Sequence, residues 1–154
     1  MKTMFGVIAL ACAPLAFAGN NGAYPIEKVA SFVVQQLDAT TLPSELRPKH
    51  EKGKKTLGDY GYVTQNVDET SAVVDSAQGS SQFTLRILER TKSGIYVCVN
   101  GNTPNAGDAN FQRVLVLKRK DSGGLLKSRE SGKEFGGCPA IGGVDDNPYS
   151  SSYN

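Results

Sequence analysis

Tryptophan is absent from this chain of 154 residues, histidine occurs once, and aromatic residues make up only 8%. The flat rings on which a sugar would stack are therefore scarce. Nucleophilic hydrolysis needs a base beside the nucleophile, and the single candidate, His50, lies in a lysine-rich segment. Zinc sites need several His or Cys ligands held together. The composition therefore argues against a Ser-His-Asp or Cys-His hydrolase and against a zinc protein.

Long apolar segments are also scarce. Residues 4–15 form an uncharged apolar run that follows Lys2 and precedes Ala16-Phe17-Ala18. This arrangement is typical of a secretory signal peptide, and the run is too short to span a bilayer. We expect residues 1–18 to be removed and the protein to act in the periplasm, with the extracellular medium as the alternative. No second run of about 20 apolar residues follows, so we expect no membrane span.

Cysteine occurs three times, and Cys12 lies within the expected leader. Leu10 is one position too close to Cys12 for a lipidation motif. Cys98 and Cys138 remain, and in an oxidising compartment they are expected to form a disulfide. The closed loop of about 41 residues would contribute roughly 4 kcal/mol of stability by the chain-entropy relation. A metal pair or a catalytic thiol is the alternative, and either would require a partner such as His50.

Basic and acidic residues are nearly balanced in the chain. The chain has 17 Lys and Arg against 15 Asp and Glu, and removing Lys2 with the leader lowers the net charge from +2 to +1. The bulk charge therefore implies no particular partner, and we expect no nucleic-acid binding. The length suits one domain, which we place at residues 19–141. Residues 142–154 have no periodicity and are predicted to form a flexible tail.

Hydrophobic periodicity predicts one helix followed by strands. Apolar residues recur at helical spacing between Pro25 and Asp38, and alternation is clearest over residues 82–89. We therefore expect an α+β fold in which an N-terminal amphipathic helix packs on an antiparallel sheet of about five strands with one disulfide. The helical stripe is Ile26, Val29, Ala30, Val33 and Leu37, and the strand segments are 59–67, 72–77, 82–89, 95–99 and 111–118, with 125–129 as a short edge strand.

Two polar loops, residues 47–58 and 100–110, are the candidate binding segments. Residues 47–55 read RPKHEKGKK and carry five cations, and residues 100–110 are rich in Asn and Gly. A local positive potential can steer an acidic protein or meet a phosphate-rich surface, although a solvated loop is the simpler interpretation. The basic stretch at 118–120 is expected only to blunt a strand edge or turn. The candidate contact residues are Arg47, Lys49, Lys52, Lys54, Lys55, Asn102, Asn105 and Asp108.

No catalytic, metal or cofactor motif is recognisable. Asp108 is the only carboxylate of the 100–110 loop, which lacks the spaced acids of a calcium loop. A pair of carboxylates could support glycoside hydrolysis, but the sequence does not single out two of them. The glycine-containing segments 53–55 and 136–143 lack phosphate-loop spacing. We expect no metal and no cofactor; the carboxylates considered are Asp59, Asp75, Glu89, Glu130 and Glu134.

Compartment, size and the lack of a catalytic motif favour a binding protein over an enzyme. Recognition residues commonly lie on loops held by a rigid sheet. The leading hypothesis is a periplasmic inhibitor or immunity protein that blocks an envelope-targeted hydrolase, such as a cell-wall amidase or a lysozyme. The alternatives are a small hydrolase of envelope polymers with unidentified carboxylates and an accessory subunit of an envelope complex. The sequence does not indicate an oligomeric state.

Overall fold

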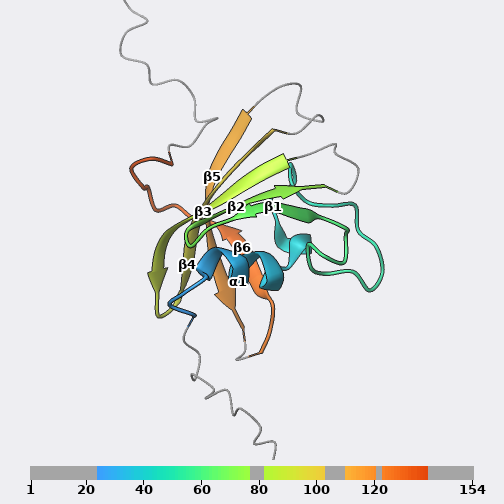
Figure 1. The fold of residues 1–154 in the computed structure, drawn as a ribbon, viewed down its shortest axis with the longest axis horizontal. Coiled ribbons are helices and arrows are strands. Elements are labelled where there is room, and N and C mark those ends of the chain that lie inside the picture. Colours follow the sequence, from blue (N-terminus) through green and yellow to red (C-terminus); the bar gives the residue numbers. More distant parts are fainter. Residues whose placement is uncertain (1–23, 77–81, 103–109, 121–122, 139–154) are drawn as a thin grey trace, which may run out of the picture.

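The computed structural model describes residues 24–76, 82–102, 110–120 and 123–138. They form one antiparallel sheet of six strands in the order β1-β2-β3-β4-β5-β6, and the sheet curls around a short helix, α1 (Figure 1). The expected combination of one helix, an antiparallel sheet and a disulfide is confirmed, but the sheet has six strands rather than about five. The fold is mostly β, because α1 has only 8 residues.

Helix α1 (Val29–Gln36) is shorter than the predicted segment from Pro25 to Asp38. Lys28 precedes it in the left-handed region at φ 51°, which interrupts helical geometry before the first turn. Ile26, which was assigned to the buried stripe, is 78% exposed. Leu37 is buried, but it leaves the helix and forms a parallel bridge with Leu126. Pairing with the sheet therefore ends the helix early.

Each strand pairs with the next along the chain, so short connections are sufficient. The first strand begins later than predicted: residues 57–61 form turns, in which Tyr60 N donates to Thr56 O, and Leu57 is buried in the core. The segment at 125–129 is confirmed as an edge strand with its bounds shifted by one residue. The strands are β1 (Val63–Val67), β2 (Ser71–Asp75), β3 (Gln82–Thr91), β4 (Gly94–Asn102), β5 (Asn110–Arg119) and β6 (Leu126–Glu130).

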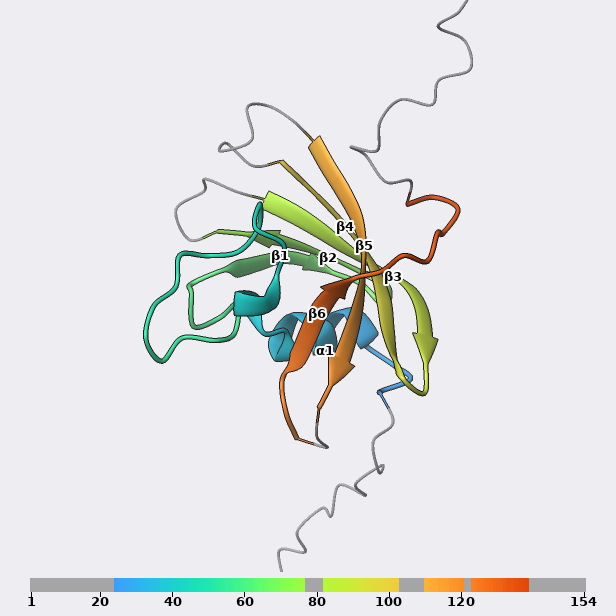
Figure 2. The same cartoon turned by 180° about the vertical axis from the view of Figure 1, so that it is seen from behind.

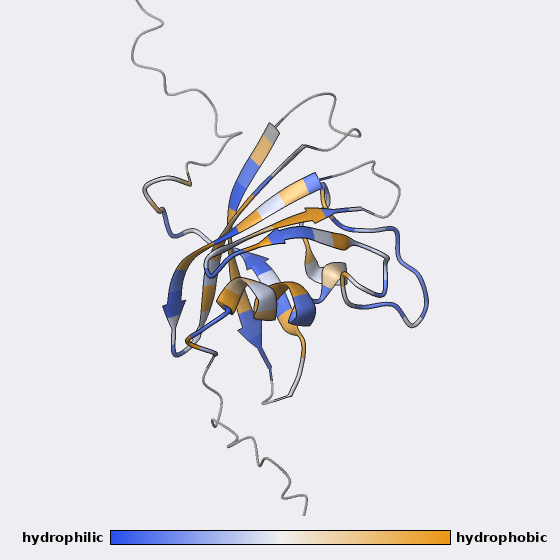
Figure 3. Ribbon diagram, in the orientation of Figure 1, coloured by the Kyte–Doolittle hydropathy of each residue, from blue (hydrophilic) through white to orange (hydrophobic). Residues whose placement is uncertain are grey.

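The hydrophobic core lies between the inner face of the sheet and α1, which is seen behind β5 and β6 in Figure 2. Alternation places Phe83 and Leu85 of β3 on this face, as predicted, and both are almost fully buried. Val33 and Leu37 meet them in the same core cluster. The hydropathy colouring shows apolar segments of α1 and the sheet with hydrophilic strand ends and loops around them (Figure 3).

The edge at β6 is covered by the segment that follows α1. Asp38 N donates to Leu126 O at 2.8 Å, and Ser128 N donates to Thr41 Oγ1 at 2.8 Å. The 3₁₀ turn η1 (Ala39–Thr41) keeps this segment against the strand. An edge covered in this way no longer presents all its backbone groups to another strand.

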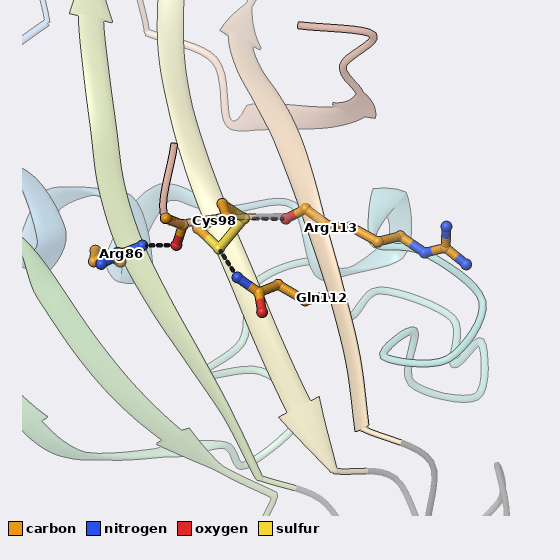
Figure 4. The surroundings of a disulfide bond; sticks show 6 residues. Arg86, Cys98, Gln112 and Arg113 are labelled. Atoms are coloured by element: carbon orange, nitrogen blue, oxygen red, sulfur yellow. Dashed lines mark hydrogen bonds between the residues drawn. A yellow bond between two sulfur atoms is a disulfide. The ribbon is translucent and has the colours of Figure 1, made fainter. Parts of the chain in front are cut away.

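The predicted disulfide between Cys98 and Cys138 is present and lies on the outer face of the sheet. It attaches residues 131–138, which we call the strap, to β4 (Figure 4). The ring of Phe135 lies 5.4 Å from that of Tyr96, and Arg86 donates to Gly137 O. The strap therefore covers part of the outer face that would otherwise be open to solvent.

The expected leader at residues 1–18 and tail at residues 142–154 lie outside the described residues. The domain boundaries at 19 and 141 also lie outside them. In the ranges from 24 to 138 that the structure describes, no helix has the length and apolar character needed to cross a membrane.

Candidate binding surface

Residues 47–55, which we call the basic loop, are mostly exposed. Arg47, Lys49, Lys52 and Lys55 are exposed, and Lys54 is half-buried. The loop projects from the side of the molecule opposite to the strap in both ribbon views, and it is coloured hydrophilic over most of its length (Figures 1, 2 and 3). Five of the eight predicted contact residues therefore lie together on one projecting segment.

Hydrogen bonds hold the basic loop at both ends. At its start, Arg47 donates from N to Pro43 O at 2.9 Å and from Nε to Leu42 O at 2.8 Å. At its end, Asp59 Oδ2 accepts from the amides of Lys55, at 2.9 Å, and Thr56, at 2.8 Å. These bonds, led by the one from the Thr56 amide, lower the pKa of Asp59 and keep its carboxylate charged. The loop is therefore anchored to the fold at both ends.

The Lys54 side chain interacts with residues of its own segment of the chain. Its ammonium lies 2.8 Å from the Glu51 carboxylate and 5.6 Å from the centre of the Tyr60 ring. Within the described part of the chain, Lys49, Lys52 and Lys55 form no ion pair. Three ammonium groups therefore remain available for an external anion, whereas Lys54 acts mainly in shaping the loop.

A polar cleft of about 390 Å³ adjoins the start of the basic loop. The segment 41–47 forms one wall, and β5 and β6 form the other. We call it the arginine cleft. Its charged lining consists of Glu45, Arg47, Arg113, Arg129 and Glu130.

Arg113 is held by two carboxylates of the arginine cleft. Its Nη2 lies 2.8 Å from Glu45 Oε1, and its Nε lies 3.6 Å from Glu130 Oε1. Glu45 has a lowered pKa, first because of a hydrogen bond from its own backbone amide and then because of the bond from Arg113. The Glu45 side chain in turn raises the pKa of Arg113. This network fixes Arg113, while Arg47 and Arg129 have no ion pair among the described residues.

The arginine cleft was not predicted from the sequence. Its residues come from three separate segments, and only Arg47 was among the predicted contact residues. Arg113 and Glu130 stand at inward-facing positions of β5 and β6, where two-residue alternation would have placed apolar side chains. Charged residues at inward-facing strand positions were therefore the sequence signal from which a polar cleft could have been predicted.

The predicted polar loop at residues 100–110 is shorter than expected. β4 continues to Asn102, which pairs with Asn110 at the start of β5. Asn102 is therefore a strand-end residue rather than a loop residue. Asn105 and Asp108 lie outside the described residues.

The residues considered for catalysis are dispersed or have structural partners. His50 is exposed on the basic loop. Asp75 accepts from Gln82 at 2.6 Å, and Glu89 pairs with Lys133 of the strap. Among the residues that the structure describes, no three His, Cys, Asp or Glu side chains are grouped so that they could hold a metal ion.

The fold and the surface together define a small, β-rich, disulfide-bonded domain that presents an anchored cationic loop beside a polar cleft. No family model, curated protein or solved structure matches the chain.

Proposed function

We propose that this protein is an exported domain that binds another protein through the basic loop and the adjoining arginine cleft. The most concrete form of the proposal is an inhibitor or immunity protein that blocks an envelope-targeted hydrolase of the amidase or lysozyme type. The loop would enter or cover the acidic cleft of the enzyme. The leader-like sequence at residues 1–18 supports the location in the periplasm.

The observation that carries the proposal is that hydrogen bonds anchor the basic loop at both ends while several of its lysines stay exposed. Asp59 holds its end, Arg47 holds its start, and three lysines of the loop lack ion pairs within the described residues. A loop that is already ordered loses less conformational entropy when it binds. Its positive charges would also accelerate encounter with an acidic partner. These are the properties expected of a loop that inserts into a protein partner.

The arginine cleft extends this surface. Arg47 belongs to both the loop and the cleft, so a partner that contacts the loop also reaches the cleft. The cleft combines two carboxylates, Glu45 and Glu130, with the guanidinium groups of Arg47, Arg113 and Arg129. Such an arrangement favours a partner surface with matched polar groups over a uniformly acidic one.

Affinity capture from a periplasmic extract, followed by an inhibition assay, tests the proposal. The unchanged protein should retain a hydrolase in a one-to-one complex and suppress its release of soluble fragments from purified cell wall. The Lys49→Gln/Lys52→Gln variant should bind at least about tenfold more weakly, since each lost charged contact is worth about 1.5–3 kcal/mol. Lys118→Gln/Lys127→Gln, which removes two cations elsewhere, is the matched control and should bind normally.

Two results would overturn the proposal. One is that no protein is retained at any salt concentration. The other is that the loop variant captures and inhibits the enzyme as well as the unchanged protein does. If the protein itself released fragments from cell wall, the hydrolase alternative would replace the inhibitor.

A further inference from the structure

A second cleft, of about 360 Å³, lies along the β5–β6 hairpin. We call it the lysine cleft. Residues of β5 that alternate with the buried Leu115 and Leu117 face the outer side of the sheet. The cleft is lined by Val116, Lys118, Arg119, Lys120, Lys127 and Arg129, with Thr41 and Ser128 at its boundary with the arginine cleft.

The lysine cleft is lined by cations that no acidic residue of its described lining neutralises. Five of its lining residues are Lys or Arg, and none of the described lining residues is acidic. Lys118 and Lys127 lie directly opposite each other in the ladder. Like charges in this position destabilise a sheet, so the arrangement costs stability in the unliganded protein. The arginine cleft differs, because Glu45 and Glu130 pair with its central arginine.

Arg119 alternates with Lys118 and pairs with the buried Leu126, so its side chain lies on the inner face of the sheet, against α1. Its guanidinium carbon lies 4.6 Å from the centre of the Phe32 ring on α1, and its Nη2 lies 3.5 Å from Gln36 Oε1. Its Nε is buried and donates to no acceptor among the described residues. The cations that face outward into the cleft from β5 and β6 are therefore Lys118, Lys127 and Arg129.

We propose that the lysine cleft binds a small anion that carries two or more phosphate groups. Arg recognises phosphate through paired N–H donors, and Lys contributes a compact point charge. The volume of the cleft is in the range of small-molecule sites. The same chemistry is offered by a free di- or triphosphate and by the phosphorylated headgroup of a lipid. The site uses no residue of the basic loop, although it shares Thr41, Ser128 and Arg129 with the arginine cleft. Variants of Lys118 and Lys127, which line the lysine cleft only, therefore test it separately from the proposed inhibitor function.

Calorimetric titration of the purified protein with tripolyphosphate at low salt tests the site. We expect saturable one-to-one binding that weakens as salt is added, because the charges are exposed. Lys118→Gln/Lys127→Gln should weaken binding by at least about tenfold. Lys49→Gln/Lys52→Gln removes the same charge from the basic loop and should leave the affinity within about twofold. The hairpin variant should stay folded, since it relieves a like-charge pair.

Sedimentation with vesicles separates the two sources of phosphate. Binding to cardiolipin vesicles, whose lipid headgroup carries two phosphates, but not to phosphatidylcholine vesicles, lost in the hairpin variant, assigns the site to a headgroup. Tripolyphosphate binding without vesicle binding assigns it to a free phosphate compound. The proposal is overturned if neither probe binds, if the loop variant loses as much affinity as the hairpin variant, or if an oligoglutamate of equal charge binds as tightly.

Discussion

Lys118 and Lys127 are cross-strand partners in the β5–β6 ladder, two ammonium side chains placed directly opposite each other on the outer face of the sheet. Reversing one charge should convert a repulsive pair into an attractive one. We expect Lys127→Glu to raise the free energy of unfolding by about 0.2–1 kcal/mol. Urea denaturation would measure this change.

Lys92→Glu is the control for that experiment, because Lys92 is an exposed cation in the turn between β3 and β4. It should change stability by less than about 0.5 kcal/mol. A Lys127→Glu variant less stable than the unchanged protein would show that the opposed lysines do not repel each other.

The disulfide should contribute much of the stability of this fold. Cys98 and Cys138 are separated by 40 positions and hold the strap on β4. Cys98→Ala/Cys138→Ala should therefore lower the free energy of unfolding by roughly 4 kcal/mol. The unchanged protein under reducing conditions should unfold at nearly the same urea concentration as the double variant. Labelling of both thiols in the unreduced protein would refute the bond.

Asp38 connects the end of α1 to the edge of the sheet. It is only 7% exposed, and its Oδ1 accepts from Thr40 N at 3.1 Å and from Thr40 Oγ1 at 2.6 Å. Asp38→Ala removes this cap and should destabilise the protein by about 1–2 kcal/mol. Asp38→Asn retains an acceptor oxygen and should lose less. Equal losses in the two variants would show that the charge, rather than the cap, is what matters.

Asp68 should titrate at an unusually low pH. Hydrogen bonds from the Ser71 hydroxyl, and then from the Thr70 and Ser71 amides, lower its pKa from 3.8 to about 2. The folded pKa is below the unfolded one, so the stabilisation is present above pH 3.8 and is lost as the pH falls through about 2. Carboxyl NMR should follow this titration. Ser71→Ala should raise the pKa towards its ordinary value, and a midpoint near 3.8 in the unchanged protein would contradict the predicted shift.

Gly101 has no room for a side chain. A Cβ at this position would lie 2.7 Å from Cε1 of Phe111 and 3.0 Å from Cβ of Phe83, and both rings are buried. Gly101→Ala should therefore cost about 1–3 kcal/mol through overpacking. Gly132→Ala is the matched control, since no heavy atom beyond its chain neighbours lies within 4 Å of the added carbon. Similar melting temperatures for the two variants would contradict the predicted clash.

Local sequence patterns were sufficient to predict the helix and the strands, but not the residues at which they begin and end. The alternation of Phe83 and Leu85 predicted β3, and the spacing of Val29 and Val33 predicted α1. The same helical spacing also included Ile26, which is exposed in the structure. Periodicity records which side chains could share a face, but the pairing of Leu37 with Leu126 decides where the helix ends.

Of the candidate sites, the basic loop could be predicted from the sequence and the two clefts could not. The basic loop was recognisable because its five cations lie within nine residues and no aliphatic or aromatic apolar residue interrupts them. The two clefts were not recognisable, because Glu45, Arg113 and Arg129 are brought together only by the register of β5 with β6 and by the segment along their edge. In particular, the lysines at 118 and 120 were interpreted as edge protection, and Lys127 was not considered.

The sequence by itself determined the candidate leader, the even pair of cysteines, the faces of the main strands and the exposed basic loop. Each of these depends on neighbouring residues or on composition. Only the tertiary structure decided that the sheet has six strands, that residues 37–41 cover β6, and that two clefts of different charge adjoin at Ser128 and Arg129. These features depend on contacts between residues far apart in the chain, and local periodicity carries no information about which distant segments will meet.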